Sequence, residues 1–225
     1  MIKNILNLGD AAIYYDFGNQ INKETNKKVI DYFNSIKKSS IDGIKNLIPS
    51  YNKLIVSFDL KITNFDELKK KIEDIKIYEF SEKKKQKLKI PICCDDEFFL
   101  DKNILTKRLK LSTNEILKKF LNKDYFCYMT GFVAGMPFLG DISKELRTDR
   151  LETPRVKVPQ GSVGITEQFS NIYTFESPGG WNIIGNTPVN IFNSNNEKNP
   201  VLINPGDEVS FFQITKKEYE KLNEK

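Results

Sequence analysis

Three of the chain's four arginines, Arg147, Arg150 and Arg155, fall within nine residues, whereas lysine supplies the positive charge almost everywhere else. A guanidinium group presents a rigid planar fork of donors that matches a carboxylate or a phosphate, which a flexible lysine does not. The surrounding stretch, residues 147–188, is rich in proline and glycine, which fix or permit unusual backbone angles. Two interpretations follow: an anion-binding site, or the tight turns of a small β-barrel.

Lys157 follows Arg155 by two residues, so on a strand both side chains point to one face, together with Thr153. That face could bind the carboxylate of a small acid or a phosphate, with the backbone amides of residues 161–163 as extra donors. The residues assigned to substrate binding are Arg155, Gly161, Ser162 and Thr187.

The sequence contains no histidine. This removes Ser-His-Asp and Cys-His nucleophile pairs and most catalytic zinc sites, so chemistry must use carboxylates, lysine, arginine, hydroxyls or backbone amides. Glu176 is the strongest candidate for a general acid or base, and Lys157 is the second candidate catalytic residue. The alternative for Glu176 is a structural salt bridge to Arg155 that ties two barrel loops together.

An aromatic pair and an acidic turn are further candidates for ligand contact. Phe138 and Trp181 are assigned to the pocket wall, although a lone tryptophan is more often part of the core. The three carboxylates at residues 95–97 could hold a hard cation such as magnesium. The ligand spacing of a calcium loop is absent, so a solvated turn is favoured and no metal site is assigned.

Composition predicts a globular protein in a reducing compartment. Hydrophobic residues make up 39% of the 225 residues, and no apolar run approaches the length needed to cross a bilayer. The net charge of +5 is spread along the chain, which argues against a nucleic-acid partner. The three cysteines lack zinc-type spacing, and the N-terminus shows no small-residue cleavage site. We therefore expect a soluble, cytoplasmic protein without a membrane or nucleic-acid partner.

The first half of the chain predicts an α+β domain. Short apolar runs predict strands at residues 11–17, 44–48, 53–59 and 76–80. Amphipathic spacing predicts helices at residues 23–38 and 64–75, the second with Asn64 as its N-cap. The alternation of strands and helices suggests a ferredoxin-like sandwich.

Residues 81–89 are nearly pure charge, and we place a domain boundary there, which gives domains over residues 1–85 and 86–225. The second domain is expected to open with a strand at residues 88–94. Two helices follow at residues 102–110 and 112–121, the latter opened by a capping box.

From Tyr125 onward the pattern changes to short strands separated by turn residues. Nine of the twelve glycines and seven of the nine prolines lie between Gly131 and Gly206, which predicts an all-β barrel or sandwich with tight corners. The apolar loop from Phe132 to Leu139 is expected to be exposed and to suit another subunit.

Four segments together resemble one family closely. They are GFVAGMPFLGDI at residues 131–142, RLETPRVKVPQGSVGI at 150–165, ESPGGWNIIGNTP at 176–188 and NPGDEV at 204–209. The chain is identified by them as a member of the family that contains the B subunit of bacterial 5-oxoprolinase, the sporulation-kinase inhibitor KipI and allophanate hydrolase subunit 1. Gly9-Asp10-Ala11, Phe17-Gly18, Gly43 and Pro49 extend the resemblance over essentially the whole chain.

The resemblance implies a ferredoxin-like α+β domain followed by a cyclophilin-like β-barrel. It also implies a homologous partner, the C subunit of 5-oxoprolinase, with which such a chain takes part in the ATP-coupled opening of the 5-oxoproline ring to glutamate. The resemblance further implies ATP as a cofactor, a small carboxylate as the substrate and magnesium as a candidate ion. It also implies that the chain alone is inactive. Two alternatives stay open: a KipI-like regulatory module that inhibits a histidine kinase, and an allophanate-hydrolase-related subunit.

The sequence departs from the family pattern at several positions. Phe120 stands where the family usually has a histidine, and Asn186 stands where an arginine is common. Further departures are Ala134, Met136, Asp141 and Asp149.

Overall fold

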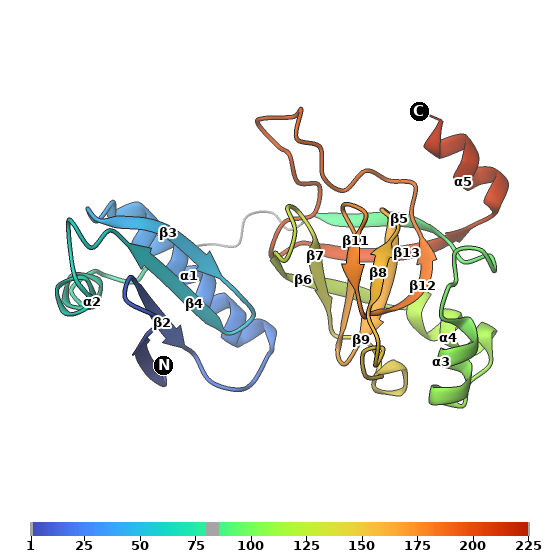
Figure 1. Ribbon diagram of the computed structural model, residues 1–225, viewed down its shortest axis with the longest axis horizontal. Coiled ribbons are helices and arrows are strands. Elements are labelled where there is room, and N and C mark those ends of the chain that lie inside the picture. The colour runs from blue at the N-terminus through green and yellow to red at the C-terminus, as the bar shows by residue number, and fades with distance from the viewer. Residues whose placement is uncertain (1, 80–85, 225) are drawn as a thin grey trace. The chain divides into compact units, whose positions relative to one another are not determined.

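The computed structural model describes residues 2–79 and 86–224. The chain divides into two compact units, Met1–Lys83 and Lys84–Lys225 (Figure 1). Most of the charged run at residues 81–89 lies outside the described residues, and its last three residues begin the first strand of the second unit.

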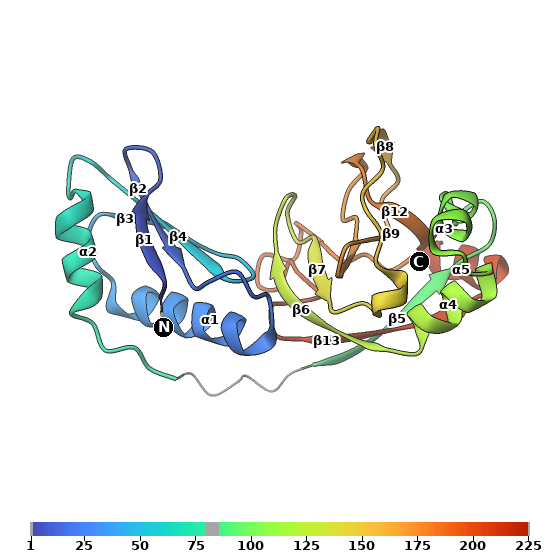
Figure 2. The same cartoon turned by 90° about the horizontal axis from the view of Figure 1, so that it is seen from below.

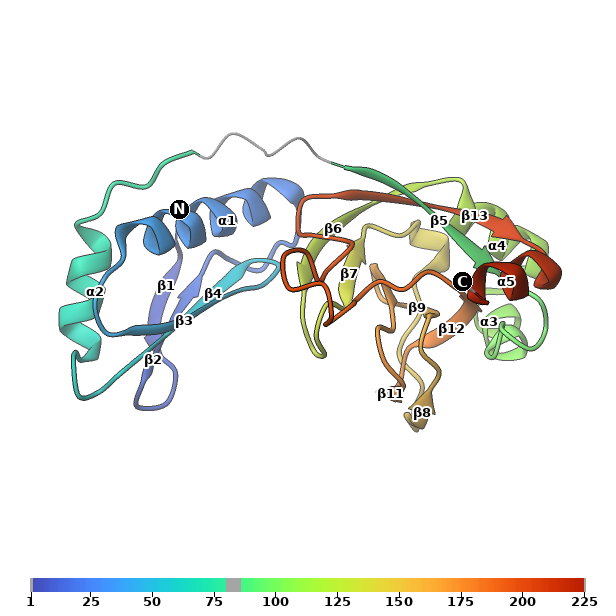
Figure 3. The same cartoon turned by 90° about the horizontal axis from the view of Figure 1, so that it is seen from above.

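The first unit is an antiparallel sheet covered by helices. Its strands are β1 (Asn4–Asn7), β2 (Ala12–Asp16), β3 (Ile44–Pro49) and β4 (Lys53–Phe58), in the order β1-β2-β4-β3. Its helices are α1 (Lys23–Ser39) and α2 (Phe65–Glu73). Helix α1 runs along one face of the sheet (Figures 2 and 3), where Val29 and Ile36 are buried in the core.

Both helices of this unit begin where the sequence predicts. The Asn22 side chain accepts a hydrogen bond from the Thr25 amide at 2.8 Å, and the Asn64 side chain accepts one from the Glu67 amide at 3.0 Å. Each asparagine satisfies an amide that has no partner inside the helix. These local contacts set the helix starts independently of the rest of the fold.

The last strand of the ferredoxin-like pattern is not found. Residues 76–79 form no strand, so the prediction of a strand at 76–80 is wrong over its described part, and Phe80 lies outside the described residues. The sheet edge beside β2 is taken instead by β1, which pairs Asn4 with Asp16. Strand β1 is short and mostly exposed, so it lacks the alternation that marks a strand in sequence. The α+β layer is present, but the ferredoxin-like connectivity is not confirmed.

The second unit is built on a closed β-barrel, as predicted. In barrel order its strands are β10 (Phe169–Ile172), β7 (Pro137–Gly140), β6 (Asp124–Thr130), β13 (Glu208–Ile214), β5 (Lys87–Cys93), β12 (Asn182–Asn186) and β9 (Ser162–Thr166). Strands β5 and β13 are parallel, and the other described pairs are antiparallel. Closure leaves no open edge that could pair with another chain.

Helices cover part of the barrel. They are α3 (Lys102–Leu109), α4 (Thr113–Leu121) and α5 (Lys216–Asn223), with a short 3-10 turn at Lys144–Leu146. The predicted capping box of α4 forms. Phe120 on α4 is fully buried, with ring centroids 5.1 Å from Tyr125 and 5.0 Å from Phe211. The position at which the family usually has a histidine is therefore a core position in this chain.

A two-stranded ribbon, β8 (Arg155–Val158) with β11 (Ser177–Gly179), projects from the barrel (Figures 2 and 3). A second hydrophobic cluster joins Val158 of this ribbon to barrel residues. Its buried members are Met136, Val158, Tyr173 and Ile183. The ribbon carries the arginine, lysine and glutamate residues that the sequence singles out, so its attachment to the barrel decides where they lie.

The three cysteine thiols, Cys93, Cys94 and Cys127, are buried and unpaired by disulfides. Burial raises the pKa of all three and raises that of Cys94 to about 12. At pH 8 the thiolate of Cys94 is then roughly a thousandfold scarcer than that of an ordinary thiol. We expect the folded chain to resist alkylation by iodoacetamide at pH 8, whereas the chain in urea reacts at all three sites. Rapid labelling of the folded chain, read by mass spectrometry, would contradict this burial.

No helix within the described residues is long and apolar enough to cross a membrane.

Candidate functional site

Arg155 forms a bidentate ion pair with Asp101, a residue that the sequence patterns do not indicate as a candidate. Its Nη1 and Nη2 atoms lie 3.0 and 2.7 Å from the two carboxylate oxygens. Asp101 is completely buried, and its Oδ2 also accepts the Ile183 amide at 2.6 Å. Although Asp101 precedes α3, its carboxylate makes no capping bond. Arg155 therefore links the ribbon to α3 and β12, and two of its donors are not free for a ligand.

Lys157 and Glu176, the two candidate catalytic residues, pair with each other at the surface. Their charged atoms are 2.8 Å apart, and the side chains are 74% and 55% exposed. The predicted salt bridge between Arg155 and Glu176 is therefore wrong, because each has a different partner. The hydrogen bond that Lys157 donates to the Glu176 carboxylate raises the pKa of Lys157, so this amine stays protonated at neutral pH and supplies charge rather than a base.

Gly161, Ser162 and Thr187 meet in a buried turn beside the barrel. The Gly161 amide donates to the Tyr173 carbonyl at 2.8 Å, and the Thr187 amide donates to the Gly161 carbonyl at 2.9 Å. Gly161 has a φ of +79°, and a methyl group there would collide with the Thr187 carbonyl. The Ser162 amide donates to the Pro159 carbonyl at 3.2 Å, so the Gly161 and Ser162 amides expected to hold an anion are engaged within the protein, and Ser162 is 1% exposed.

Asn186, which replaces a common arginine of the family, connects this turn to the C-terminal helix. Its Nδ2 donates to the Gln160 carbonyl at 2.8 Å, and its Oδ1 accepts from the Tyr219 hydroxyl at 2.9 Å. Tyr219 also packs on Phe98, with ring centroids 4.5 Å apart. Both ends of the Asn186 side chain are therefore used to hold α5 against the barrel.

The predicted pocket-wall pair comes together on the outer face of the barrel. The rings of Phe138 and Trp181 are 5.6 Å apart at an interplanar angle of 75°, an edge-to-face contact. Trp181 is only 9% exposed. A methyl group at Gly164 would lie 3.0 Å from Trp181 Cβ and 2.8 Å from Asn171 Oδ1, which places the Asn171 amide beside the aromatic pair.

Sequence reasoning missed two polar residues of this face, Asn171 and Tyr173. Both are 2% exposed, and they stand two apart along β10 and its extension. A methyl group at Gly179 would collide with the Tyr173 hydroxyl, so this hydroxyl lies directly against the Gly179–Trp181 turn. The alternation of Asn171 and Tyr173 is the signal that could have indicated a shared face.

The clustered arginines do not converge on one point. Arg108 Nη1 donates to the carbonyls of Asp149 and Arg150 at 3.2 and 3.4 Å, Arg155 binds Asp101, and Arg150 lies beside Gly180. Arg147 lines a surface pocket of about 550 Å³. The other residues that line it are Arg108, Leu109, Thr148, Asp149, Glu152 and Glu167.

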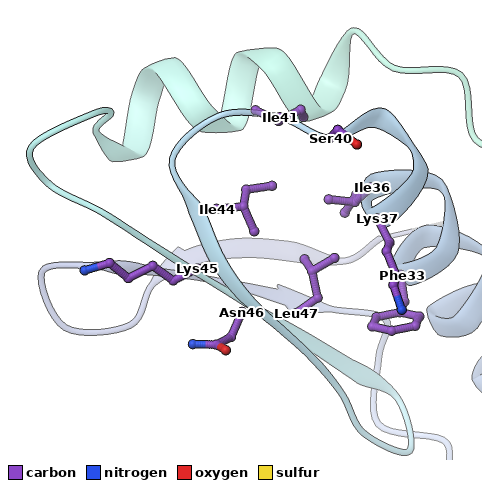
Figure 4. A pocket seen from close by; sticks show the side chains of 9 residues that line it. All are labelled: Phe33, Ile36, Lys37, Ser40, Ile41, Ile44, Lys45, Asn46 and Leu47. Carbon is purple, nitrogen blue, oxygen red and sulfur yellow. The ribbon is translucent and has the colours of Figure 1, made fainter. Parts of the chain in front are cut away.

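The first unit carries a separate pocket of about 370 Å³ between α1 and β3 (Figure 4). Ile36 of α1 and Ile44 of β3 point toward each other across it, whereas Lys45 points away. Phe33 and Leu47 complete its apolar walls. It contains none of the residues that the sequence selects for chemistry.

The acidic turn at residues 95–97 does not gather its carboxylates around one point. Asp96 pairs with Lys102 at 2.6 Å, and Glu97 pairs with Lys216 at 2.9 Å. Among residues 2–79 and 86–224, no group of three histidine, cysteine or acidic side chains could hold a metal ion. These carboxylates bind lysines and hold α3 and α5 locally.

Comparison with known proteins decides the family. Residues 3–203 match the family model described as carboxyltransferase domain, subdomain C and D. The chain belongs to this family. It is 33% identical over 229 residues to the B subunit of 5-oxoprolinase from Bacillus subtilis, and the match covers 96% of this chain and 95% of that protein. The resemblance seen in the motifs at residues 131–209 is thereby confirmed.

Two solved structures have the same fold. The protein TTHA0988 superposes with a TM-score of 0.78 at 27% identity, over 91% of this chain and 40% of that chain. The urea amidolyase of K. lactis superposes with a TM-score of 0.83 at 18% identity, over 98% of this chain and 15% of that chain. The chain thus spans less than half of each of these larger proteins.

Proposed function

We propose that the chain is the B subunit of an ATP-dependent 5-oxoprolinase, which acts with a homologous C subunit to open the ring of 5-oxoproline to glutamate. The observation that carries this proposal is the end-to-end match, 33% identical over 95% of its length, to a protein named as the B subunit of 5-oxoprolinase. A match over nearly the whole of both chains supports a shared role for the whole chain rather than for one module.

In this proposal the chain alone is inactive. The sequence contains no Gly-x-x-x-x-Gly-Lys-Ser/Thr loop for nucleotide phosphates, and its described residues contain no carboxylate cluster for magnesium. The chain thus offers no phosphate loop of this type, and we assign ATP binding to the assembled pair.

Co-purification tests the proposal. The full chain and its homologous partner, expressed together, should form a heteromer that hydrolyses ATP only when 5-oxoproline is present. Each protein assayed alone should show no such activity. A stable pair without 5-oxoproline-dependent hydrolysis of ATP would overturn the enzymatic role.

One observation favours the regulatory alternative, a module that inhibits a histidine kinase. Phe120 and Asn186, which stand where the family usually has histidine and arginine, both serve structural contacts in this chain. An inactive pair combined with inhibition of kinase autophosphorylation by the chain alone would favour this role. The allophanate-hydrolase-related alternative predicts allophanate-dependent activity in the same assay.

The loop from Phe132 to Leu139 is less exposed than predicted, because Met136 and Leu139 are buried. Phe132, its first residue, is 69% exposed and has a φ of +69°, a conformation that non-glycine residues seldom adopt. Strained, exposed aromatic residues are characteristic of functional surfaces. Within the proposed function, we assign Phe132 to the contact with the homologous partner.

Replacing Phe132 by aspartate should weaken the heteromer by at least about tenfold, since it removes an aromatic anchor and places a charge at the contact. Aspartate tolerates the left-handed conformation, so the fold should persist. The control is Phe212→Asp, which changes another exposed phenylalanine, 47% exposed on β13. Light scattering and calorimetric titration of the mixed proteins measure the effect. Equal losses in the two variants would count against a contact at Phe132.

A further inference from the structure

We propose that Arg150, held against the Gly179–Trp181 turn, binds the carboxylate of a small acid. This site deepens the proposed function, on which the identity of the acid as 5-oxoproline rests. The site lies on the outer face of the barrel, beside the Phe138–Trp181 pair and at the base of the β8–β11 ribbon.

The four arginines differ in whether their guanidinium groups already bind other groups of the protein. Arg155 commits two nitrogens to Asp101, and Arg108 donates to backbone carbonyls. Within residues 2–79 and 86–224, the guanidinium groups of Arg147 and Arg150 form no ion pair. Only an arginine with an uncommitted fork can present two parallel donors to a carboxylate.

The backbone around Arg150 is held at three consecutive residues. The Asn182 side chain donates to the Asp149 carbonyl at 2.9 Å, Arg108 donates to the Arg150 carbonyl at 3.4 Å, and the Leu151 amide donates to the Gly180 carbonyl at 2.7 Å. These bonds bring together segments that are far apart in sequence. The backbone of Arg150 is therefore fixed before a ligand binds, so less conformational entropy is lost when the side chain binds one.

The Arg150 side chain lies over Gly180. Its Nε is 3.5 Å from the position that a Gly180 Cβ would occupy, and Pro154 borders the same position at 3.5 Å. A bare glycine backbone lets the guanidinium group approach the turn closely. The Nε of Arg150 is thereby placed beside the turn, while the residue as a whole stays exposed to solvent.

Two polar groups lie next to this turn. The Tyr173 hydroxyl touches Gly179. Burial raises the pKa of Tyr173, although hydrogen bonds with the Asn171 side chain and the Trp181 backbone and the positive charges of Arg150 and Arg155 oppose the shift. The hydroxyl therefore keeps its proton at neutral pH and remains a donor. On the same face, the buried Asn171 Oδ1 accepts no hydrogen bond from the described residues.

These groups are complementary to a small acid that also carries an amide. Arg150 and the Tyr173 hydroxyl supply positive charge and a donor for a carboxylate, while Asn171 Oδ1 supplies an acceptor for an N–H group. An unpaired buried acceptor is costly, so a ligand that satisfies it gains binding free energy. A lactam acid carries both groups.

Trp181, the only tryptophan of the chain, reports on this site. Titration of the full chain with 5-oxoproline should change the Trp181 fluorescence saturably. The Arg150→Ala variant should bind roughly 10- to 100-fold more weakly, and Arg150→Lys should not restore binding, because a point charge cannot replace the fork. The neutral lactam 2-pyrrolidinone, which lacks the carboxylate, should not distinguish wild type from Arg150→Ala.

Arg147→Ala is the matched control, since it removes the other arginine without an ion pair from the same segment, three residues away. It should titrate like the wild type. Equal affinities in wild type and Arg150→Ala, equal losses in both alanine variants, or no saturable response of the wild type would overturn the site. Melting curves of each variant show whether the fold is kept.

The same data separate the site from the proposed function. Saturable, Arg150-dependent binding together with an inactive heteromer would keep the site and reject the enzymatic role. An active heteromer whose Arg150→Ala variant has an unchanged KM for 5-oxoproline would keep the enzyme and reject the site.

Discussion

Replacing Arg155 by alanine is expected to lower the free energy of unfolding of the second unit by about 3 kcal/mol. The loss leaves the carboxylate of Asp101 fully buried without its counter-charge, with the Ile183 amide still donating a hydrogen bond to it. In a unit of this size the melting temperature should fall by roughly 6–12 °C. Urea unfolding followed by circular dichroism measures the free energy.

Lys157→Ala is the matched control, because it breaks an ion pair of the same ribbon that is exposed on both sides. It should change the stability little. Adding Asp101→Asn to Arg155→Ala should recover part of the loss, since the buried charge is then gone while an acceptor for the Ile183 amide remains. If Arg155→Ala unfolds at the same urea concentration as Lys157→Ala, the buried pair does not hold the ribbon.

The Gly179→Ala variant is expected to be destabilised by about 2 kcal/mol, the usual cost of forcing extra atoms into a packed region. The added methyl group would collide with the Tyr173 hydroxyl and lie 2.8 Å from the ring carbon that bears it. Tyr173 is 2% exposed and belongs to a buried cluster, so a shift of its ring would disturb its neighbours. Thermal unfolding of the variant gives the measurement.

The neighbouring glycine provides the comparison. A methyl group at Gly180 would lie 3.5 Å from both Arg150 and Pro154, an ordinary van der Waals distance, so Gly180→Ala should be nearly neutral in stability. Tyr173→Phe should relieve part of the cost of Gly179→Ala, because it removes the colliding oxygen. Equal stabilities of the two alanine variants would mean that Tyr173 does not pack against Gly179 as described.

Each of the three clustered arginines has a different role in the folded chain. Arg155 is a structural clamp on Asp101, Arg147 lines a surface pocket, and Arg150 carries the uncommitted fork beside the Gly179–Trp181 turn. The scaffold interpretation therefore applies to Arg155, and the anion-site interpretation is the one that we propose for Arg150. The residue first assigned to substrate binding, Arg155, is the one whose donors are most fully used by the protein.

Local patterns in the sequence were sufficient for most elements and for the class of the second unit. Helices α2 and α4 begin at the predicted caps, and α1 begins at the predicted residue, since a capping bond spans only three residues and depends little on the rest of the chain. The concentration of glycine and proline after Gly131 indicated the barrel, because closed barrels need tight turns at short intervals. The family also follows from contiguous motifs.

Contacts between residues far apart in the sequence are determined only by the tertiary structure. Arg155 and Asp101 are 54 residues apart, and no periodicity or spacing links them. The same holds for β1, which the sequence pattern did not predict, whereas the strand predicted at residues 76–80 is absent over its described part. A charged side chain has several possible partners of similar chemistry, and the tertiary fold selects among them by distance and burial. Arg155 therefore pairs with the buried aspartate that precedes α3 rather than with the nearby Glu176.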